Sequence, residues 1–396
     1  MTLAKLILRR REERRVQAGH PWVFSNEVAT DRTPLTGFTP GEFVNVLTHS
    51  ERALGTAYVN PHSLICARLV SRDKDAPLDA AALHARLERA LALRRRLGWL
   101  PDCRLVYGES DALPGLVVDG YGTVLVVQIG TAGMERLREE VVSALVSLCA
   151  PRAVVLRNDL ASRELEGLES YVETVHGSVP EPVVVHENGC EFEISPLAGQ
   201  KTGWYYDHRL NRARGAHLAR DTRVLDCFSY AGGFGIQAAA GGAREVLCVD
   251  SSRAALDAVV RNAERNRVGD RIDVRCGDVF ETLRALRAEG EQFDLVMLDP
   301  PAFVRRKKDL KAGSEAYARL NRLAMQVLPA DGYLLSASCS SHLSASEHQA
   351  LIRRAARDIG RELQILERGH QAPDHPVHPA LPETEYLKTV IVRVLG

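Results

Sequence analysis

The chain has 396 residues, which is enough for two or three domains that each bury a core. Its composition, 45% hydrophobic and 26% charged, is ordinary for a globular protein, and no apolar run approaches the length of a membrane span. Acidic and basic residues balance at 51 each, which excludes a chain that attracts polyanions over its whole surface but allows local basic patches.

The eight cysteines are scattered along the chain without a Cys-x-x-Cys pair. Most of them lie in strand-like apolar runs, which favours reduced thiols over disulfides. The apolar stretch at the N-terminus is also too short for a signal peptide. We therefore expect a cytoplasmic protein that does not associate with a membrane.

Residues 1–72 alternate short apolar runs with turns, which predicts a small β-barrel with strands at 41–47 and 64–70. Five arginines between positions 9 and 15 give this segment a basic start, and a second basic run lies between positions 305 and 311. Local patches of this kind can bind nucleic acid, although a solvated loop explains a single charge run about as often.

Residues 73–182 predict a helix followed by a small α+β domain. The helix should begin after Asp79 as its N-cap, with Leu83, Leu87 and Leu91 on one buried face. The other elements expected here are strands over 117–122, 124–129 and 153–157, a helix over 135–148 and a linker over 178–182.

From about residue 183 to 396, strands alternate with helices, which predicts the α/β class with a mostly parallel sheet and helices on both faces. An apolar run at 224–227 breaks into a turn at 228–233 that ends on two glycines and leads into a helix. Glycine lets a ligand approach the backbone closely. A second apolar run ends on Asp250, and an acid at this position can accept both hydroxyls of a ribose. This half of the chain is therefore expected to bind a nucleoside-like cofactor.

The turn does not fit a dinucleotide fingerprint, because the three-glycine spacing is absent and two aromatic residues occupy it. Gly277-Asp278 and then Asp299-Pro300-Pro301-Ala302-Phe303 follow later strands. This order resembles the Rossmann-like class I S-adenosylmethionine (SAM) methyltransferases; the alternative is a generic doubly wound domain with acidic strand ends. The resemblance implies cofactor contacts from Phe228, Ser229, Tyr230, Gly232, Gly233, Asp250, Ser251, Asp278, Val279 and Asp299.

The chain as a whole is similar to one family, the bacterial large-subunit ribosomal RNA cytosine-C5 methyltransferases. The resemblance implies a PUA-like RNA-binding barrel over 1–72, a central EEHEE domain with a linker helix over 73–182, and a SAM methyltransferase domain over 183–396. It also implies large-subunit ribosomal RNA as partner and leaves a homodimer open. The stretches that carry it are residues 14–24, 57–61, 108–119, 200–209, 338–340 and 385–388.

Carbon 5 of cytosine must be activated before it can be methylated, because this carbon is a poor nucleophile. A thiolate that adds to carbon 6 turns the ring into an enamine, which can take the methyl group. Charge that develops on the ring must also be stabilised. Cys339 follows a strand-like run at 333–337 and Asp299 ends another, so both should lie at the ligand-binding edge of the sheet. They are the candidate catalytic residues, and the alternative for Cys339 is an ordinary buried thiol.

Substrate contacts are expected around the same edge. The two prolines after Asp299 stiffen the turn, and Phe303 can stack on a base. Basic neighbours of Cys339, such as Lys201 or Arg209, are candidates for stabilising its thiolate. The expected substrate-binding residues are Lys201, Arg209, Pro300, Pro301 and Phe303.

Many RNA cytosine-C5 methyltransferases carry a second cysteine where this chain has Asp299, so proton removal falls to another group or to water.

Two other functions stay open from the sequence. The Asp-Pro-Pro-x-Phe order also resembles the Asn-Pro-Pro-Tyr motif of enzymes that methylate the exocyclic amine of guanine or cytosine. The second alternative is a non-catalytic ribosome-assembly factor. Separately, the cluster of His370, Asp374, His375 and His378 is conceivable as a metal site, but its prolines favour a rigid loop over the active site.

Overall fold

The computed structural model describes residues 2–197, 199 and 202–396, which fall into two compact units. Unit 1 comprises residues 1–183, 195–204 and 373–384, and unit 2 comprises residues 184–194, 205–372 and 385–396. Each unit is therefore built from segments that are far apart in the sequence. No helix in the described ranges is long and apolar enough to cross a lipid bilayer.

The first part of unit 1 is a five-stranded sheet around an apolar core, with the strand order β1-β3-β4-β5-β2. A strand was expected at 64–70 but begins only at Ala67, because the amide of Asn60 donates to the carbonyl of Cys66 at 2.7 Å and closes the intervening residues into a turn. The elements are β1 (Ala4–Ile7), α1 (Glu13–Gln17), β2 (Trp22–Val23), β3 (Glu42–Leu47), β4 (Ala53–Val59) and β5 (Ala67–Ser71).

Helix α2 (Ala80–Leu97) begins where the sequence predicts. The side chain of Asp79 accepts a hydrogen bond from the amide of Ala82 at 2.8 Å, which satisfies one free donor of the first turn. Leu83, Leu87 and Leu91 are buried in the core that α2 shares with the central sheet. The helix ends at Gly98, whose φ of 70° suits glycine.

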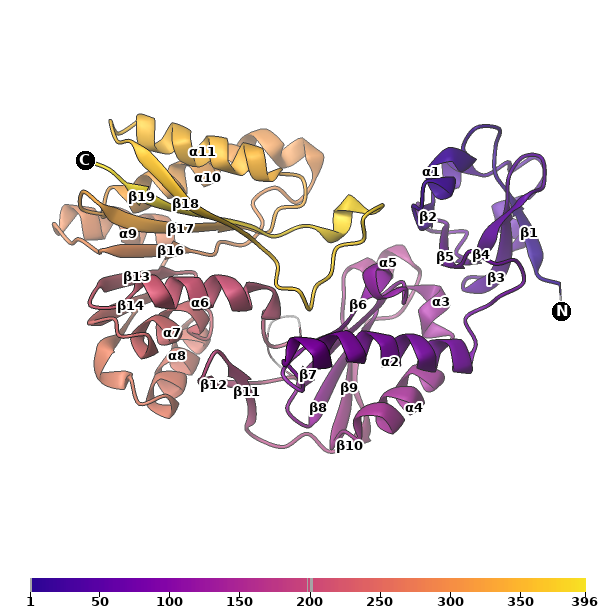
Figure 1. Ribbon diagram of the computed structural model, residues 1–396, viewed down its shortest axis with the longest axis horizontal. Coiled ribbons are helices and arrows are strands. Elements are labelled where there is room, and N and C mark those ends of the chain that lie inside the picture. Colours follow the sequence, from indigo (N-terminus) through magenta and orange to yellow (C-terminus); the bar gives the residue numbers. More distant parts are fainter. Residues whose placement is uncertain (1, 198, 200–201) are drawn as a thin grey trace. The chain divides into compact units, whose positions relative to one another are not determined.

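The central sheet of unit 1 has the strand order β10-β9-β8-β7-β6, and helices α2 and α4 pack on it (Figure 1). The helix expected at 135–148 is found slightly later, with Leu137 as its N-cap. The elements are β6 (Cys103–Tyr107), β7 (Leu116–Tyr121), β8 (Val124–Ile129), α3 (Ala132–Glu135), α4 (Arg138–Cys149), β9 (Ala153–Asn158), α5 (Ser162–Leu165) and β10 (Tyr171–Gly177).

Unit 2 holds a seven-stranded sheet with the order β15-β14-β13-β16-β17-β19-β18. The first five strands are parallel and β19 runs antiparallel to both of its neighbours, which confirms the mostly parallel sheet. The strands are β13 (Arg223–Cys227), β14 (Glu245–Asp250), β15 (Ile272–Cys276), β16 (Leu295–Leu298), β17 (Gly332–Ser338), β18 (Leu363–His370) and β19 (Lys388–Val394), and a separate hairpin is formed by β11 (Val183–Glu187) and β12 (Cys190–Ile194).

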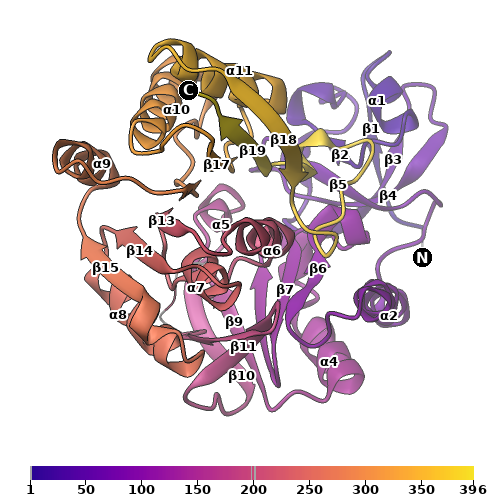
Figure 2. The same cartoon turned by 60° about the vertical axis from the view of Figure 1, so that its left-hand side comes forward.

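Helices cover both faces of this sheet. Side chains of α9, α10 and α11 share one core with the strands, while α7 and α8 contact β13 and β14 from the other side together with α6 (Figure 1). Helices α10 and α11 lie side by side (Figure 2). The helices are α6 (Arg209–Leu218), α7 (Gly233–Ala240), α8 (Arg253–Arg265), α9 (Val279–Ala288), α10 (Leu310–Met325) and α11 (Ala345–Arg357).

Candidate functional site

The turn after β13 has a backbone that residues other than glycine rarely adopt. Phe228 and Tyr230 have φ angles of 63° and 48°, in the left-handed region, and Gly232 follows with 87°. The amides of Phe228 and Ser229 both donate to the carbonyl of Val249, at 2.9 and 3.1 Å, which holds the turn against β14. Left-handed aromatic residues cost free energy and persist mainly at ligand sites. The turn is therefore a preorganised candidate for cofactor binding.

A buried hydroxyl in this turn has no partner of its own. Ser229 is 5% exposed, and its Oγ has no hydrogen-bond partner in the part of the chain that the structure describes. An unpaired buried polar atom is costly, and a polar ligand would satisfy it. Gly235 lets α7 approach the sheet, because an added Cβ would lie 2.6 Å from the sulfur of Cys248. The turn thus fits a polar nucleoside held close to the backbone.

Asp250 ends β14 with its carboxylate already oriented. Its Oδ2 accepts from the amide of Tyr230 at 3.0 Å, and its Oδ1 accepts from the amide of Ser252 at 2.9 Å. A carboxylate oxygen has more than one acceptor site, so both oxygens can still receive a hydroxyl. The predicted contact of Asp250 with a ribose is compatible with this geometry.

The remaining predicted cofactor residues lie after β14 and β15. Ser251 is exposed beside Asp250. Asp278 caps α9 by accepting from the amide of Glu281 at 3.0 Å, and it is exposed to solvent. Val279 is buried in the apolar core, so only its backbone is available to a ligand. Roles for these residues in cofactor binding stay predictions.

Asp226 is a buried acid in the middle of the sheet, and no sequence pattern singled it out as a site residue. It is 1% exposed, and its Oδ2 accepts from the amide of Gly235 at 2.8 Å. Burial raises the pKa of Asp226 to about 7; the Gly235 hydrogen bond opposes this shift, and the charges of Asp299 and Asp250 add to it. The carboxyl group therefore gains its charge near neutral pH.

Replacing Asp226 with asparagine should change how stability depends on pH. Because the pKa is raised in the folded state, wild-type stability is lost as the pH rises from about 4 through 7, whereas Asp226→Asn has no charge to bury. At about 1.4 kcal/mol per pKa unit, the variant should gain about 1–4 kcal/mol on the wild type between pH 4 and 8. Thermal unfolding without cofactor measures this, and parallel pH profiles for the two proteins would contradict it.

Asp299, directly after β16, is paired with a histidine. Its Oδ1 lies 3.1 Å from Nε2 of His208, which is 3% exposed. Burial lowers the pKa of His208, but the charge and hydrogen bond of Asp299, together with Asp207, outweigh it, so that the pKa is raised. The raised pKa favours the protonated imidazole of His208 beside the carboxyl group of Asp299. Sequence reasoning missed His208, although it lies in the 200–209 stretch that carries the family resemblance.

Cys339 follows β17 in a loop that is fixed on both sides. Its thiol is partly exposed, whereas the flanking serines are buried. The Oγ of Ser340 accepts from the amide of Val304 at 3.1 Å and lies 2.9 Å from the hydroxyl of Tyr317. Lys388 donates from Nζ to the carbonyls of Ser340 and Leu343, at 2.5 and 2.6 Å. The loop therefore holds the thiol in a defined place.

Lys388 is the charged neighbour of Cys339 that the structure identifies. Burial lowers the pKa of Lys388 to about 8, and the charges of Cys339, Glu385 and Glu347 oppose this shift. Lys201 and Arg209 were the residues predicted to stabilise the thiolate of Cys339. Lys201 lies outside the described residues. Lys388 could have been singled out, because it belongs to the 385–388 stretch that carries the family resemblance.

Tyr205 connects the cofactor turn with the two candidate catalytic residues. Its ring meets that of Tyr230 edge to face, with 5.6 Å between the centroids. Burial raises the pKa of Tyr205, and the charges of Tyr230, Asp299, Asp207 and Cys339 raise it further. These groups therefore surround one phenol, which places the strand ends of β13, β16 and β17 around a common site.

The predicted substrate residues have different surroundings. Arg209 is buried, with its Nε 3.6 Å from Oε2 of Glu187 and its guanidinium over the ring of Tyr206. Direct contact of Arg209 with a substrate stays a prediction, and the burial weighs against it. Pro300 is buried, whereas Pro301 is exposed and Phe303 is partly exposed.

The His-rich cluster near the C-terminus is divided between the units: Asp374, His375 and His378 belong to unit 1, whereas His370 ends β18 in unit 2. The carboxylate of Asp374 accepts from the amide of Arg104 at 3.0 Å and lies 2.9 Å from Nδ1 of His375, while its carbonyl accepts from Arg94 at 2.6 Å. These contacts anchor the stretch to the central sheet; a role over the active site stays a prediction. No group of three His, Cys, Asp or Glu side chains within the described ranges could hold a metal ion.

Comparisons with known proteins cover almost the whole chain. A family model described as a PUA-like domain matches residues 6–72, and one described as an S-adenosylmethionine-dependent methyltransferase matches residues 133–393. Two relatives carry the name Ribosomal RNA large subunit methyltransferase I. The relative from Shewanella frigidimarina is 39% identical over 96% of this chain and 97% of its own length, and that from Cronobacter sakazakii is 38% identical over 99% of both.

Solved structures agree on the fold. A Streptococcus mutans protein assigned to the SAM-dependent methyltransferases superposes with a TM-score of 0.83 at 20% identity, over 99% of this chain and 100% of its own. A second protein, complexed with SAH, gives a TM-score of 0.85, also at 20% identity, over the same shares of the two chains. At this identity the likeness concerns the fold alone.

Proposed function

The chain belongs to the S-adenosylmethionine-dependent methyltransferases, and from that membership we propose that it methylates carbon 5 of cytosine in large-subunit ribosomal RNA. The RNA class comes from the name that its relatives carry. The observation that carries the chemistry is the position of Cys339 and Asp299 after the paired parallel strands β17 and β16, next to the cofactor turn after β13. The thiol of Cys339 and the carboxyl group of Asp299 could therefore both contact the same base of the substrate.

The cofactor would be held by the turn at 228–233 and by Asp250. Its chemical contribution is a methyl group on a sulfonium, which is an electrophile. The unpaired hydroxyl of Ser229 and the oriented carboxylate of Asp250 fit a polar nucleoside of this kind. The protein's own residues have to bring carbon 5 of the base into line and make it nucleophilic.

Cys339 would do so by forming a bond from its thiolate sulfur to carbon 6, which moves the carbon 5–carbon 6 electron pair into the ring. Carbon 5 then takes the methyl group. Water or another basic group takes the proton from carbon 5, the electron pair of that bond forms the carbon 5–carbon 6 double bond again, and the sulfur–carbon 6 bond breaks to restore the thiolate. Asp299, whose Oδ1 lies 3.1 Å from Nε2 of His208, would accept a hydrogen bond from the exocyclic amine of the base and fix its orientation.

The second candidate is methylation of the exocyclic amine itself. In that reaction Asp299 would bind the amine as the reacting group, and no thiol would be needed. The Asp-Pro-Pro-x-Phe segment and the ion pair of Asp299 with His208 suit this alternative equally well. The partly exposed thiol of Cys339 in its braced loop favours the carbon reaction. A non-catalytic assembly factor is disfavoured by the preorganised cofactor turn.

Modified nucleosides in ribosomal RNA provide the test. Large-subunit RNA from cells that lack the gene should lack one 5-methylcytidine that the parent strain contains, as measured by mass mapping of nuclease fragments. Restoring the gene should restore that nucleotide, and a gene encoding Cys339→Ala should not. Loss of a methylated amine instead would favour the second candidate, and unchanged RNA would contradict both.

The PUA-like barrel is proposed to supply RNA affinity. Arg10, Arg11 and Arg14 are exposed and have no ion pair in the described part of the chain. Arg15 differs, because it pairs with Glu27 at 2.8 Å. Phosphate contacts from the exposed arginines would make binding depend strongly on salt.

Neutralising the three exposed arginines should therefore weaken RNA binding. Removing three phosphate contacts should lower the slope of log affinity against log salt by about 2–3, with cofactor affinity unchanged. Filter binding of large-subunit RNA to the triple Arg→Gln variant, at several salt concentrations, measures this. Neutralising Arg89, Arg95 and Arg96, exposed on α2, is the matched control. Equal slopes for wild type and the first variant would remove the barrel's arginines from the interface.

A further inference from the structure

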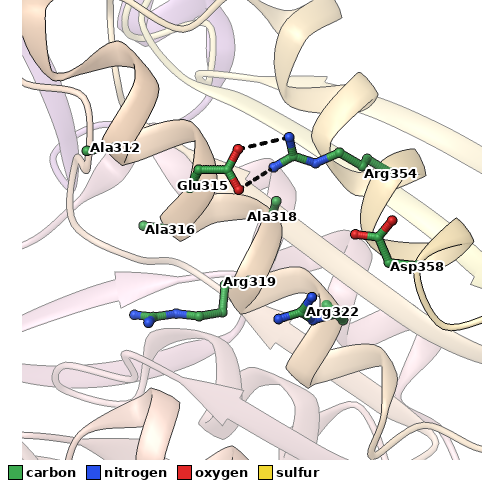
Figure 3. Close-up of a pocket in the computed structure, with 8 residues that line it drawn as sticks. All are labelled: Ala312, Glu315, Ala316, Ala318, Arg319, Arg322, Arg354 and Asp358. Carbon is green, nitrogen blue, oxygen red and sulfur yellow. Dashed lines mark hydrogen bonds and ion pairs between the residues drawn. The ribbon is translucent and has the colours of Figure 1, made fainter.

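Helices α10 and α11 form a groove on unit 2 that the proposed chemistry does not use. Its volume is about 490 Å³, and three arginines and two acids line it (Figure 3). Arg354 forms a bidentate ion pair with Glu315, at 3.0 and 2.9 Å. Asp358 lies 3.9 Å from the guanidinium group of its neighbour Arg357. Arg319 and Arg322 have no ion pair within the described ranges. The groove therefore presents two uncompensated cations.

An aromatic pair connects this groove with the proposed base site. The guanidinium carbon of Arg319 lies 4.4 Å from the ring centroid of Phe280, and Arg319 extends away from the Glu315–Arg354 pair (Figure 3). The Phe280 ring in turn lies 6.1 Å from the ring of Phe303, centroid to centroid. Phe303 belongs to the segment that begins at Asp299. A row of two rings and the guanidinium group of Arg319 thus leads from the site to the groove, which Arg322, three residues further along α10, also lines.

The start of the groove is fixed against that segment by a glycine. An added Cβ at Gly313, in the first turns of α10, would lie 2.6 Å from the carbonyl oxygen of Phe303 and 2.5 Å from Cγ2 of Val304. Only glycine lets the helix approach this closely. The five cations between positions 305 and 311 are exposed, have no ion pair in the described part of the chain, and lead directly into α10.

We propose that the RNA strand next to the target base follows this row, which rests on the proposed RNA methyltransferase function. One base stacks on Phe280 and Phe303, and backbone phosphates bind Arg319 and Arg322. Aromatic faces accept any base, and guanidinium groups bind phosphate through two parallel hydrogen bonds. The combination is the one by which proteins hold single-stranded nucleic acid in a positively charged groove. The surface thereby extends the substrate site beyond the target nucleotide.

The test removes the two charges and keeps the side-chain length. In full-length Arg319→Gln/Arg322→Gln, KM for unmodified large-subunit ribosomal RNA should rise about tenfold, while kcat at saturating RNA stays near wild type. The slope of log affinity against log salt should fall by about 1.4, because two contacts with single-stranded RNA are lost. Arg267→Gln/Arg353→Gln removes two exposed charges of unit 2 that do not line the groove and have no ion pair within the described residues, and it should leave both quantities unchanged.

Calorimetry with S-adenosylhomocysteine checks that both variants keep a folded cofactor site. Phe280→Leu, which keeps apolar volume but removes the ring, should raise KM in the same direction. An unchanged KM and salt slope in Arg319→Gln/Arg322→Gln, with wild-type cofactor affinity, would overturn the proposed RNA path and leave the proposed function standing. If the wild-type protein methylates no ribosomal RNA, the proposed function fails instead.

Discussion

Cys339→Ala should lose methyl transfer to RNA completely while it keeps wild-type affinity for S-adenosylhomocysteine. The thiol makes the only bond that activates carbon 5, so its removal leaves a ring that cannot attack the methyl group. Cys339→Ser should be equally inactive, because a hydroxyl is far less nucleophilic near neutral pH. Incorporation of labelled methyl groups into large-subunit RNA measures the loss. Cys149→Ala, which removes a partly exposed cysteine at the end of α4 in unit 1, should be fully active.

The covalent bond between Cys339 and the base can also be detected directly, if the reaction is stopped before this bond breaks. RNA that contains 5-fluorocytosine cannot lose a proton from carbon 5, so the protein–RNA bond should persist after methylation. Wild-type protein and Cys149→Ala should both give a slowly migrating band on a denaturing gel that depends on S-adenosylmethionine. Cys339→Ala should give none. Normal methylation by Cys339→Ala would make amine methylation at Asp299 the leading interpretation.

Asp250→Ala is expected to lose most of the cofactor affinity. The carboxylate is held by the amides of Tyr230 and Ser252, so it is ready to accept two hydroxyls without reorganisation. Losing charged hydrogen bonds of this kind should cost about 2–4 kcal/mol, which is about thirtyfold to several hundredfold in Kd. Titration calorimetry with S-adenosylhomocysteine measures it.

A matched control separates this local effect from a general loss of charge. Asp257 is exposed on α8, a few residues further along, and Asp257→Ala should bind the cofactor like the wild type. Thermal unfolding of both variants without ligand checks that the turn at 228–233 stays folded. Unchanged affinity in Asp250→Ala would remove this acid from the cofactor site.

The sequence was informative where structure is local. The apolar stripe of α2, its Asp79 cap and the alternation of strands and helices after residue 183 depend on neighbouring residues, and each is found where it was predicted. The turn at 228–233 was recognised because its glycines and aromatic residues are consecutive.

What the sequence missed depends on contacts between distant residues. His208 and Asp299 are far apart in the chain: His208 directly precedes α6 and Asp299 follows β16, and they meet only in the folded unit. Lys388 contacts the Cys339 loop because β19 returns antiparallel beside β17. The assignment of residues 373–384 to unit 1 rests on Asp374 binding Arg94 and Arg104, which no local pattern encodes. The three consecutive domains expected from the sequence stay a prediction.

The central claim is that the methyl group goes to carbon 5 of cytosine. Large-subunit RNA transcribed with cytidine tritiated at carbon 5 tests it directly, because only this reaction exchanges the carbon 5 hydrogen for the methyl group. The proposed mechanism predicts that tritium appears in water in the same amount as methyl groups enter the RNA, and that Cys339→Ala gives neither. Methyl incorporation without tritium release would contradict the proposed mechanism.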